Sequence, residues 1–168
     1  MDTLTFLRTI LPSNGLYIAA RLTGKGFRNQ VCTSLEELTQ YVLAYDAQGV
    51  AAYHACAAYR EHSVDGVKDG KPIKQTRTHK NVRALRSFYM DLDVKPGVGT
   101  AFESQSEACD ALARFCAATG LPIPMVVSSG GGIHVYWTLT HDISPESWRA
   151  TAEGLKLLAA KLGFKADP

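Results

Sequence analysis

The chain has 168 residues, of which 46% are hydrophobic and 20% are charged, and its formal net charge is +2. Its length allows one good core, and a composition of this kind is typical of a globular protein. No apolar run reaches the roughly 18 residues of a membrane span, and the N-terminus lacks a signal-peptide layout, so we expect a cytoplasmic protein with no membrane partner.

The first part of the chain, about residues 1–60, predicts an N-terminal α/β module. Apolar periodicity and breaker residues indicate a helix at 3–11, strands at 16–22 and 27–32, a helix at 34–47 and a strand at 50–59. A Gly-Lys-Gly turn separates the first two strands, so we expect them to form a hairpin. Thr33 and Glu36 have the spacing of a capping box, which predicts where the second helix begins.

Basic residues concentrate in the segment that follows. Eight Lys and Arg residues stand against three acidic ones between positions 60 and 86, namely Arg60, Lys68, Lys71, Lys74, Arg77, Lys80, Arg83 and Arg86. Residues 64–80 also carry glycine and proline breakers, so we predict a mobile loop there. A solvated loop would account for the run by itself. A nucleic-acid backbone or a triphosphate would too, because cations beside a polyanion release counterions.

The second part, about residues 80–168, predicts a second set of elements. We expect strands at 88–94, 125–128 and 133–139, and helices at 104–119 and 145–162. Ser104 and Glu107 form a capping box, and Ser144-Pro145-Glu146 is a strong helix start. A further strand should follow Phe164, so we expect the chain to be an N-terminal piece of a longer protein.

The four cysteines indicate neither a zinc site nor a disulfide framework. Cys32, Cys56, Cys109 and Cys116 form no CxxC pair, and no histidine lies at zinc-finger spacing from them. Cys109 and Cys116 are seven residues apart on a predicted helix, so both can face the core. We predict that all four are buried thiols in a reducing compartment.

Two aspartates interrupt an otherwise apolar strand. In the run FYMDLDV, Asp91 and Asp93 are two residues apart, and strand side chains alternate faces, so both carboxylates project from the same face. Carboxylates held this way repel each other unless a cation neutralises them, and Mg²⁺ or Mn²⁺ suits oxygen ligands. Two exposed aspartates beside the Pro-Gly turn that follows would give the same pattern.

A glycine triplet lies between the last two predicted strands, in the run SSGGGIHVYW. Gly130, Gly131 and Gly132 let the backbone approach a ligand closely, and their amides form a concave anion site to which Ser129 adds a hydroxyl. His134 begins the returning strand and has the chemistry to donate to a phosphate. A flexible hairpin with a lone histidine is the alternative. Tyr136 and Trp137 could stack on a base, but core packing is favoured.

Together, the DLD strand and the SSGGGIHVYW strand resemble the archaeo-eukaryotic primase superfamily, and especially the primase-polymerase domains of phages and plasmids. The motifs cover about residues 80–137. The resemblance implies a single catalytic domain over residues 1–168, of α/β or α+β class, with an RRM-like sheet beside the N-terminal module. It also implies Mg²⁺ or Mn²⁺, nucleoside triphosphates, a single-stranded DNA template and, by analogy, a helicase as partners.

The resemblance assigns roles to individual residues. It implies that Asp91 and Asp93 bind the metals and that His134 contacts the triphosphate together with Ser129 and the glycine turn. It implies a third carboxylate on a later strand, for which Asp167 is the candidate. Family members often have an arginine where this chain has Gly131. Nearby cations can supply that charge, and we select Lys80 and Arg83.

The expected activity is template-directed nucleotidyl transfer in DNA replication, with no protein nucleophile. A non-catalytic, RRM-like module that binds single strands is the main alternative, although such modules expose aromatic residues on their strands. A metal-dependent nuclease or a rolling-circle initiator is a third reading. A rolling-circle site needs paired histidines, and the five histidines of this chain are unpaired in sequence.

Overall fold

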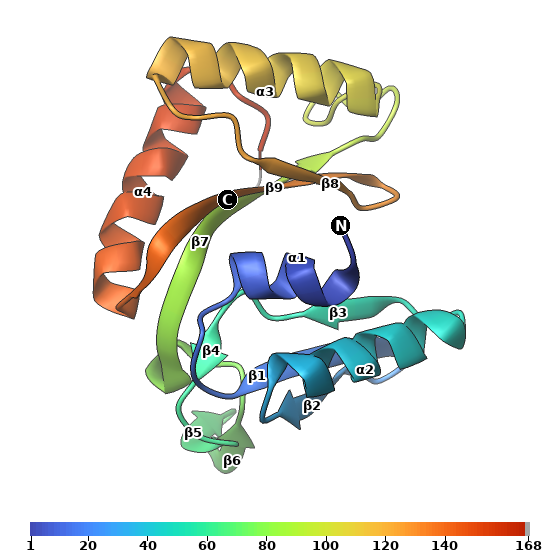
Figure 1. Cartoon of the computed structure of the whole chain (residues 1–168), viewed down its shortest axis with the longest axis vertical. Coiled ribbons are helices and arrows are strands. Elements are labelled where there is room, and N and C mark those ends of the chain that lie inside the picture. Colours follow the sequence, from blue (N-terminus) through green and yellow to red (C-terminus); the bar gives the residue numbers. More distant parts are fainter. Residues whose placement is uncertain (167–168) are drawn as a thin grey trace. The chain divides into compact units, whose positions relative to one another are not determined.

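The computed structural model describes residues 1–166. They fold into two compact units, which we call unit 1 (Met1–Arg86 and Thr140–Pro145) and unit 2 (Ser87–Leu139 and Glu146–Pro168). Helices combine with antiparallel sheets, so the α+β class expected from the sequence is confirmed (Figure 1). The finer expectation of an RRM-like sheet stays a prediction.

Unit 1 is built around a three-stranded antiparallel sheet with strand order β2-β1-β3. Its helices and strands are α1 (Thr3–Ile10), β1 (Tyr17–Thr23), β2 (Gly26–Cys32), α2 (Leu35–Ala47), β3 (Ala52–His54) and β4 (Ala58–Tyr59). The predicted first helix, hairpin and second helix are confirmed. The strand predicted at 50–59 is two short strands instead. The chain leaves the sheet at Ala55, and β4 pairs with the first part of β7 (Val82–Asp93).

The helix α2 starts one residue later than the predicted capping box. Ser34 is the N-cap, and its hydroxyl accepts a hydrogen bond from the Glu37 amide at 3.1 Å. The Glu37 carboxylate accepts hydrogen bonds from the amide and the hydroxyl of Thr33. The pairing of Thr33 with Glu36 was therefore wrong. Both registers place a hydroxyl three residues before a glutamate, so the sequence alone does not choose between them.

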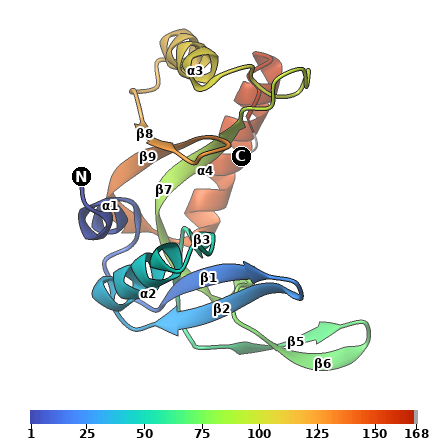
Figure 2. The ribbon, with the colours of Figure 1, turned by 90° about the vertical axis from the view of Figure 1, so that its right-hand side faces the viewer.

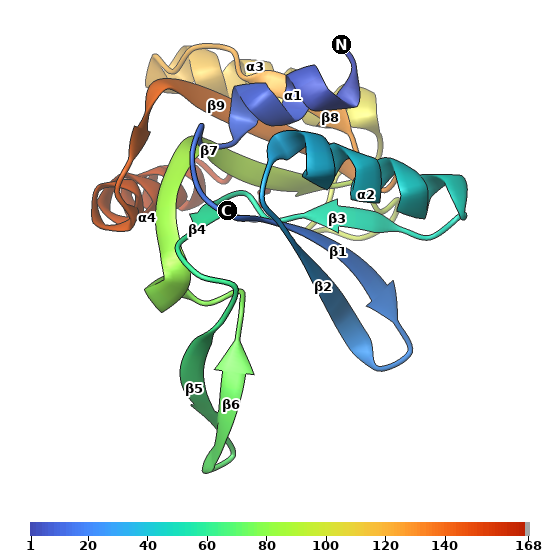
Figure 3. The same cartoon turned by 60° about the horizontal axis from the view of Figure 1, so that its bottom comes forward.

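The basic segment that we predicted as a mobile loop contains a β-hairpin. The strands β5 (Val64–Lys68) and β6 (Lys71–Gln75) pair with each other, and we call this hairpin the arm. Asp69 and Gly70 both have positive φ, 52° and 74°, as a two-residue type I′ turn requires. The Asp-Gly pair was the signal for this turn. In Figure 3 the arm extends away from the rest of unit 1.

One buried side chain anchors the base of the arm. Asn81, in the 3₁₀ helix η1 (His79–Asn81), is fully buried. Its amide donates to the carbonyls of Glu61 and Thr76, at 2.8 and 3.0 Å, and its Oδ1 accepts from the Glu61 amide at 3.0 Å. The residues on both sides of the arm are thus tied to one side chain, which satisfies their backbone groups.

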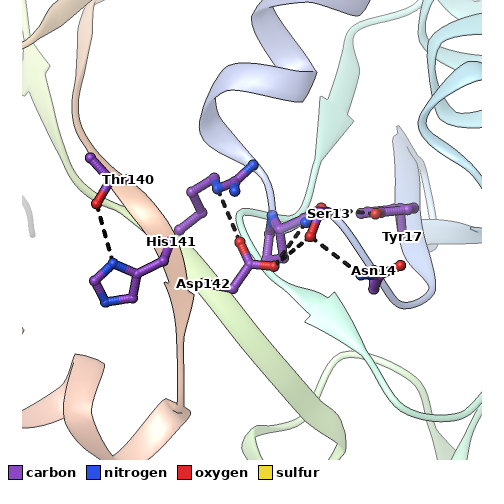
Figure 4. A network of polar contacts seen from close by, with 8 residues as sticks. Ser13, Asn14, Tyr17, Thr140, His141 and Asp142 are labelled. Atoms are coloured by element: carbon purple, nitrogen blue, oxygen red, sulfur yellow. Dashed lines mark hydrogen bonds and ion pairs between the residues drawn. The ribbon is translucent and has the colours of Figure 1, made fainter.

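A short returning segment, Thr140–Pro145, also belongs to unit 1. Asp142 accepts hydrogen bonds from the amide and the hydroxyl of Ser13, at 2.9 and 3.0 Å, and forms an ion pair with Arg86 at 3.0 Å (Figure 4). Nearby, the Tyr17 hydroxyl donates to the Pro12 carbonyl, and burial raises the pKa of Tyr17. These contacts join three segments that are distant in sequence.

Unit 2 contains most of β7 and β9 and two long helices. Its elements after β7 are α3 (Gln105–Thr119), β8 (Met125–Ser128), β9 (Gly132–Ile143) and α4 (Pro145–Lys161). The hydrogen-bonded order of its strands is β7-β9-β8. The predicted strands and helices are confirmed, but β7 and β9 are longer than expected. Ser104 caps α3 and accepts from the Glu107 amide, as its capping box predicted.

Aromatic contacts hold the helices of unit 2 in place. Trp148 stacks against both Phe88 and Tyr89 and donates to the Ser87 carbonyl at 2.8 Å. Phe88 and Tyr89 are consecutive in β7, so their side chains point to opposite faces of the sheet. Because the Trp148 ring contacts both side chains and the β7 backbone, it lies at the edge of β7. The start of α4 therefore covers that edge. At its other end, Phe164 stacks on Phe115 of α3, with ring centroids 4.4 Å apart.

The thiol environments differ from the expectation. Cys32 and Cys116 are buried, Cys56 is partly exposed, and Cys109 is exposed. The prediction that all four are buried is confirmed for Cys32 and Cys116, was wrong for Cys109 and holds only in part for Cys56. The buried stripe of α3 runs through Ala108, Leu112, Phe115 and Cys116 and leaves Cys109 at its margin. Within residues 1–166, no helix has both the length and the apolar character needed to cross a membrane.

Candidate functional site

The two aspartates lie near the end of β7, as predicted, with their carboxylates on one face. Met90 and Leu92 are almost fully buried, whereas Asp91 and Asp93 alternate with them and keep about half of their side-chain surface exposed. Strand alternation explains both observations, because the apolar residues face the core of unit 2. Asp91 and Asp93 also line the same cleft, so their carboxylates are available to a ligand.

The second motif lies beside the first. β9 neighbours β7 in the sheet, and Nε2 of His134 lies 3.6 Å from Oδ2 of Asp91. Two residues further along β9, the Tyr136 ring lies 6.5 Å from the Tyr89 ring of β7. His134 and Asp91 therefore share a face of the sheet. The structure brings together the histidine and the carboxylate that the sequence placed on separate strands.

The glycine turn is fastened to the aspartate strand through its backbone. The Gly131 carbonyl accepts from the Val94 amide at 2.9 Å, and the Gly132 carbonyl accepts from the Ser129 amide at 3.0 Å. At Gly132, a Cβ atom would lie 2.3 Å from the Leu92 carbonyl oxygen. Only glycine permits this approach, so Gly132 is required for the packing of β9 on β7.

The other two glycines have different roles. Gly130 has a φ of +85°, the left-handed region that favours glycine. Gly131 has ordinary φ, and a Cβ atom there would meet nothing within 4 Å. The space around both residues is open, so a ligand could approach their backbone. A larger side chain at position 131 would find room here.

A glutamine that the sequence analysis missed supports the turn. Gln105, the first residue of α3, donates from Nε2 to the Ser128 hydroxyl at 3.0 Å and to the Gly132 carbonyl at 3.1 Å. The start of α3 is thereby joined to the glycine turn. Gln105 directly follows Ser104, the N-cap residue of α3. Its position gives no sequence signal for a contact with the glycine turn, because the turn lies more than 20 residues further along the chain.

A cleft of about 390 Å³ borders the two aspartates. Lys156 and Lys165 line it together with small residues from the end of α4. Lys165 donates to the Ala101 carbonyl at 3.0 Å, and its ammonium lies 5.6 Å from the centre of the Phe102 ring. The cleft therefore combines carboxylates with cations, a mixed polarity that suits a ligand carrying both phosphates and a metal ion.

A third cation contacts Asp93 directly. Nζ of Lys95 lies 2.6 Å from Oδ2 of Asp93. The hydrogen bond with Asp93 raises the pKa of Lys95, and the charges of Asp93 and Asp91 add to that effect. This ion pair is exposed to solvent, so it contributes little stability and can open. The sequence analysis did not single out Lys95, although it stands only two residues after Asp93.

The donor set fits a hard divalent cation held with few protein ligands. Mg²⁺ typically binds to one or two carboxylates and completes its shell with water and substrate phosphates. Asp91 and Asp93 supply two such carboxylates on one face. Among residues 1–166 there is no group of three or more His, Cys, Asp or Glu side chains arranged to hold a metal. Asp167, the candidate third carboxylate, lies outside the described residues.

The remaining predicted residues divide into three groups. Ser129 is exposed in the turn that carries the glycines. Lys80 in η1 and Arg83 in the first part of β7 are exposed and belong to unit 1, and neither lines the cleft described here. Tyr136 and Trp137 are buried, and the Trp137 indole donates to the Pro122 carbonyl at 2.8 Å, so the favoured interpretation of core packing is confirmed.

Comparisons with protein-family models, with curated proteins and with solved structures find no match to this chain.

Proposed function

We propose that this chain is a metal-dependent nucleotidyltransferase that makes or extends primers on a single-stranded DNA template. The observation that carries the proposal is the approach of His134 to Asp91, 3.6 Å apart, beside a glycine turn fastened to the aspartate strand. The resemblance to primase-polymerases led us to expect this combination. A chance DxD pair would not require a histidine and an open glycine turn on the neighbouring strand.

Asp91 and Asp93 would hold Mg²⁺ or Mn²⁺. When bound there, a divalent cation would neutralise the triphosphate and lower the pKa of the attacking 3′-hydroxyl. The Asp93–Lys95 ion pair would open, and the freed ammonium would stay beside the phosphates. His134, when it donates from Nε2, would hold a phosphate oxygen. The open amides around Gly130 and the Ser129 hydroxyl would orient the same group, so the reaction depends on positioning and charge.

Substitution of the aspartates tests this function most directly. Asp91→Ala and Asp93→Ala should abolish the incorporation of labelled nucleotide on a single-stranded template with Mn²⁺, because each removes a metal ligand. Asp110→Ala removes an equal charge from an exposed position on α3 and should retain activity. Incorporation that survives both site substitutions would refute the proposal. Shortening of the template instead of primer extension would favour the nuclease alternative.

The histidine allows a finer test of the same site. His134→Gln removes the imidazole N–H, so it should raise KM for the nucleotide by about tenfold, which corresponds to the loss of one charge-assisted hydrogen bond. His141→Gln, at an exposed position on the same strand, is the matched control. Steady-state extension rates over a range of nucleotide concentrations give KM and kcat separately. An unchanged KM in His134→Gln would remove His134 from the nucleotide site.

A further inference from the structure

Unit 1 exposes an aromatic and apolar patch that the proposed reaction does not use. Leu22 on β1, Phe27 on β2 and Tyr53 on β3 are 51%, 50% and 41% exposed. Large apolar side chains that gather on one surface typically mark a binding site. We call Leu22, Phe27 and Tyr53 the sheet patch.

Strand register places the sheet patch on one face of the β2-β1-β3 sheet. Leu22 is directly opposite Phe27, and Ala20 is directly opposite Tyr53. Directly paired residues share a face, and so do residues two apart on one strand. All three patch residues therefore project from the face that carries Ala20. Because Ala20 has only a methyl group, the rings of the two flanking strands can meet above it.

The opposite face of the sheet is covered by helices. Arg21 of β1 lies over the Tyr45 ring of α2, and His54 of β3 meets the Phe6 ring of α1 edge to face. Residues 21 and 54 are adjacent in sequence to the patch residues, so they point the other way. Figure 2 shows both helices beside this sheet. The helices thus account for one face and leave the sheet patch on the other.

Two of the patch residues, Phe27 and Tyr53, contact each other, and the Arg77 side chain contacts Phe27. The Phe27 and Tyr53 rings pack edge to face, with centroids 5.1 Å apart. The guanidinium of Arg77 lies 5.5 Å from the centre of the Phe27 ring. Arg77 is itself exposed and lies two residues after the end of β6, so the base of the arm lies beside the Phe27 ring. Rings and guanidinium planes are the surfaces on which nucleic-acid bases stack.

Positive charge is concentrated in the segment of the chain that contains Arg77. Residues 60–86 carry eight basic and three acidic residues, a net charge of +5, whereas the rest of the chain carries ten and thirteen, a net charge of −3. On the arm, Lys68 and Lys71 are directly opposite each other beside the turn. Like charges in that position repel, and a polyanion would relieve the repulsion.

We propose that the sheet patch and Arg77 bind single-stranded DNA, with bases stacked on Phe27 and Tyr53 and the backbone held by Arg77 and the arm lysines. The choice of DNA as the strand rests on the proposed function. The stacking surface itself does not, because its residues belong to unit 1, whereas Asp91, Asp93 and His134 belong to unit 2. A module that binds single strands exposes aromatic residues on its strands. This chain has such residues on the β2-β1-β3 sheet, whereas Asp91 and Asp93 lie on β7.

Binding measured without catalysis tests this inference. Fluorescence anisotropy with a labelled oligothymidylate, in EDTA and without nucleotide, reports affinity for the full chain alone. Phe27→Leu keeps an apolar side chain of similar size but removes the ring, and it should weaken binding by about tenfold, as should Tyr53→Leu. Arg77→Gln should weaken binding and lower the salt slope by about 0.7, the share of one phosphate contact. Arg149→Gln, exposed on α4, is the control and should change neither quantity.

An abasic oligonucleotide separates stacking from charge. It keeps the phosphates but lacks bases, so Phe27→Leu should no longer change the affinity, whereas Arg77→Gln still should. Wild-type affinity of Phe27→Leu and Tyr53→Leu for the intact strand, or tighter binding of duplex than of single strand by the wild type, would overturn the inference. Asp91→Ala should bind DNA normally even though it cannot extend a primer. Loss of extension and loss of binding therefore report on the two proposals separately.

Discussion

Unit 1 and unit 2 divide the charge of the chain unequally. Twelve basic and eight acidic residues give unit 1 a net charge of +4, and six basic and eight acidic residues give unit 2 a net charge of −2. By charge alone, a polyanion would be attracted to unit 1 and repelled by unit 2. The proposed nucleotidyl transfer would use both properties, because carboxylates that hold metal ions cannot also attract DNA. The near-neutral total charge conceals this division.

The two units also use their special backbone positions differently. Gly132 in unit 2 lets two strands approach so closely that no side chain fits, whereas Gly70 in unit 1 supplies a turn conformation with open space around it. The first is a packing constraint within a sheet, and the second is a local property of a hairpin. Substitutions in the two units should therefore differ in size and in how far their effects spread.

The largest effect is expected at Gly132. Its substitution by alanine places a methyl group against the Leu92 carbonyl, a backbone atom that cannot rotate away, so we expect a loss of about 3 kcal/mol or more in the free energy of unfolding. Gly131→Ala adds the same group in open space and should change stability by no more than about 0.5 kcal/mol. Urea unfolding followed by circular dichroism measures both. Equal stability of the two variants would mean that the turn is not fastened to β7.

A slightly smaller effect is expected at Asn81. Asn81→Ala leaves the partly buried backbone groups of Glu61 and Thr76 without their partner, at a cost of about 2 kcal/mol. The arm should then exchange its amide hydrogens faster and be cut by trypsin after Lys68 and Lys74. Exchange in β8 and β9, residues 125–139, should stay at the wild-type rate. Faster exchange in unit 2 would show that the two units are more strongly coupled than this anchor implies.

The pH dependence of the free energy of unfolding should distinguish the Cys56 thiol from the exposed Cys109 thiol. Burial raises the pKa of Cys56 to about 12, partly opposed by the charge of Arg77, although the residue keeps some exposure. Its usual pKa is about 8.5, so the folded chain keeps a proton that the unfolded chain loses above that pH. Cys56 therefore contributes its full share to the free energy of unfolding below pH 8.5. That share falls by about 1.4 kcal/mol per pH unit as the pH rises from 8.5 towards 12.

Unfolding in urea at pH 8, 9 and 10 measures this slope. Cys56→Ala should make it shallower, whereas Cys109→Ala, at an exposed position, should not. Part of the slope should remain in both variants, because burial also raises the pKa values of Tyr17, Tyr59 and Cys32. A slope in Cys56→Ala equal to that of the wild type would contradict the raised pKa.

The smallest effect is expected in the arm turn. Gly70→Ala forces a side chain into a left-handed conformation with φ near +74°, which costs about 1 kcal/mol. The loss should be local, so hydrogen exchange in residues 64–75 is the suitable measurement. Gly24→Ala, in the β1–β2 turn, has open space and no positive φ, and it should leave exchange in the arm unchanged. If Gly70→Ala does not speed up hydrogen exchange in the arm, that result would argue against the type I′ turn.

Local patterns predicted most of the secondary structure. Capping residues located α3, breakers located the β1–β2 hairpin, and strand alternation placed Asp91 and Asp93 on one face. The prediction was wrong for the arm because charge and breakers were given more weight than the Asp-Gly turn signal. It was wrong for residues 50–59 because an apolar run does not reveal that the chain changes sheets at Ala55.

Residue type and spacing alone predicted two carboxylates on one face of a strand, and a glycine turn that leads into the strand of His134. These features depend only on residues close together in sequence. Only the tertiary structure decided which strands lie side by side. It placed His134 beside Asp91, joined Gln105 to the glycine turn, and brought Phe27 and Tyr53 together over Ala20. The physical reason is that pairing between distant segments follows from the burial of whole sheet faces, to which no single local pattern corresponds.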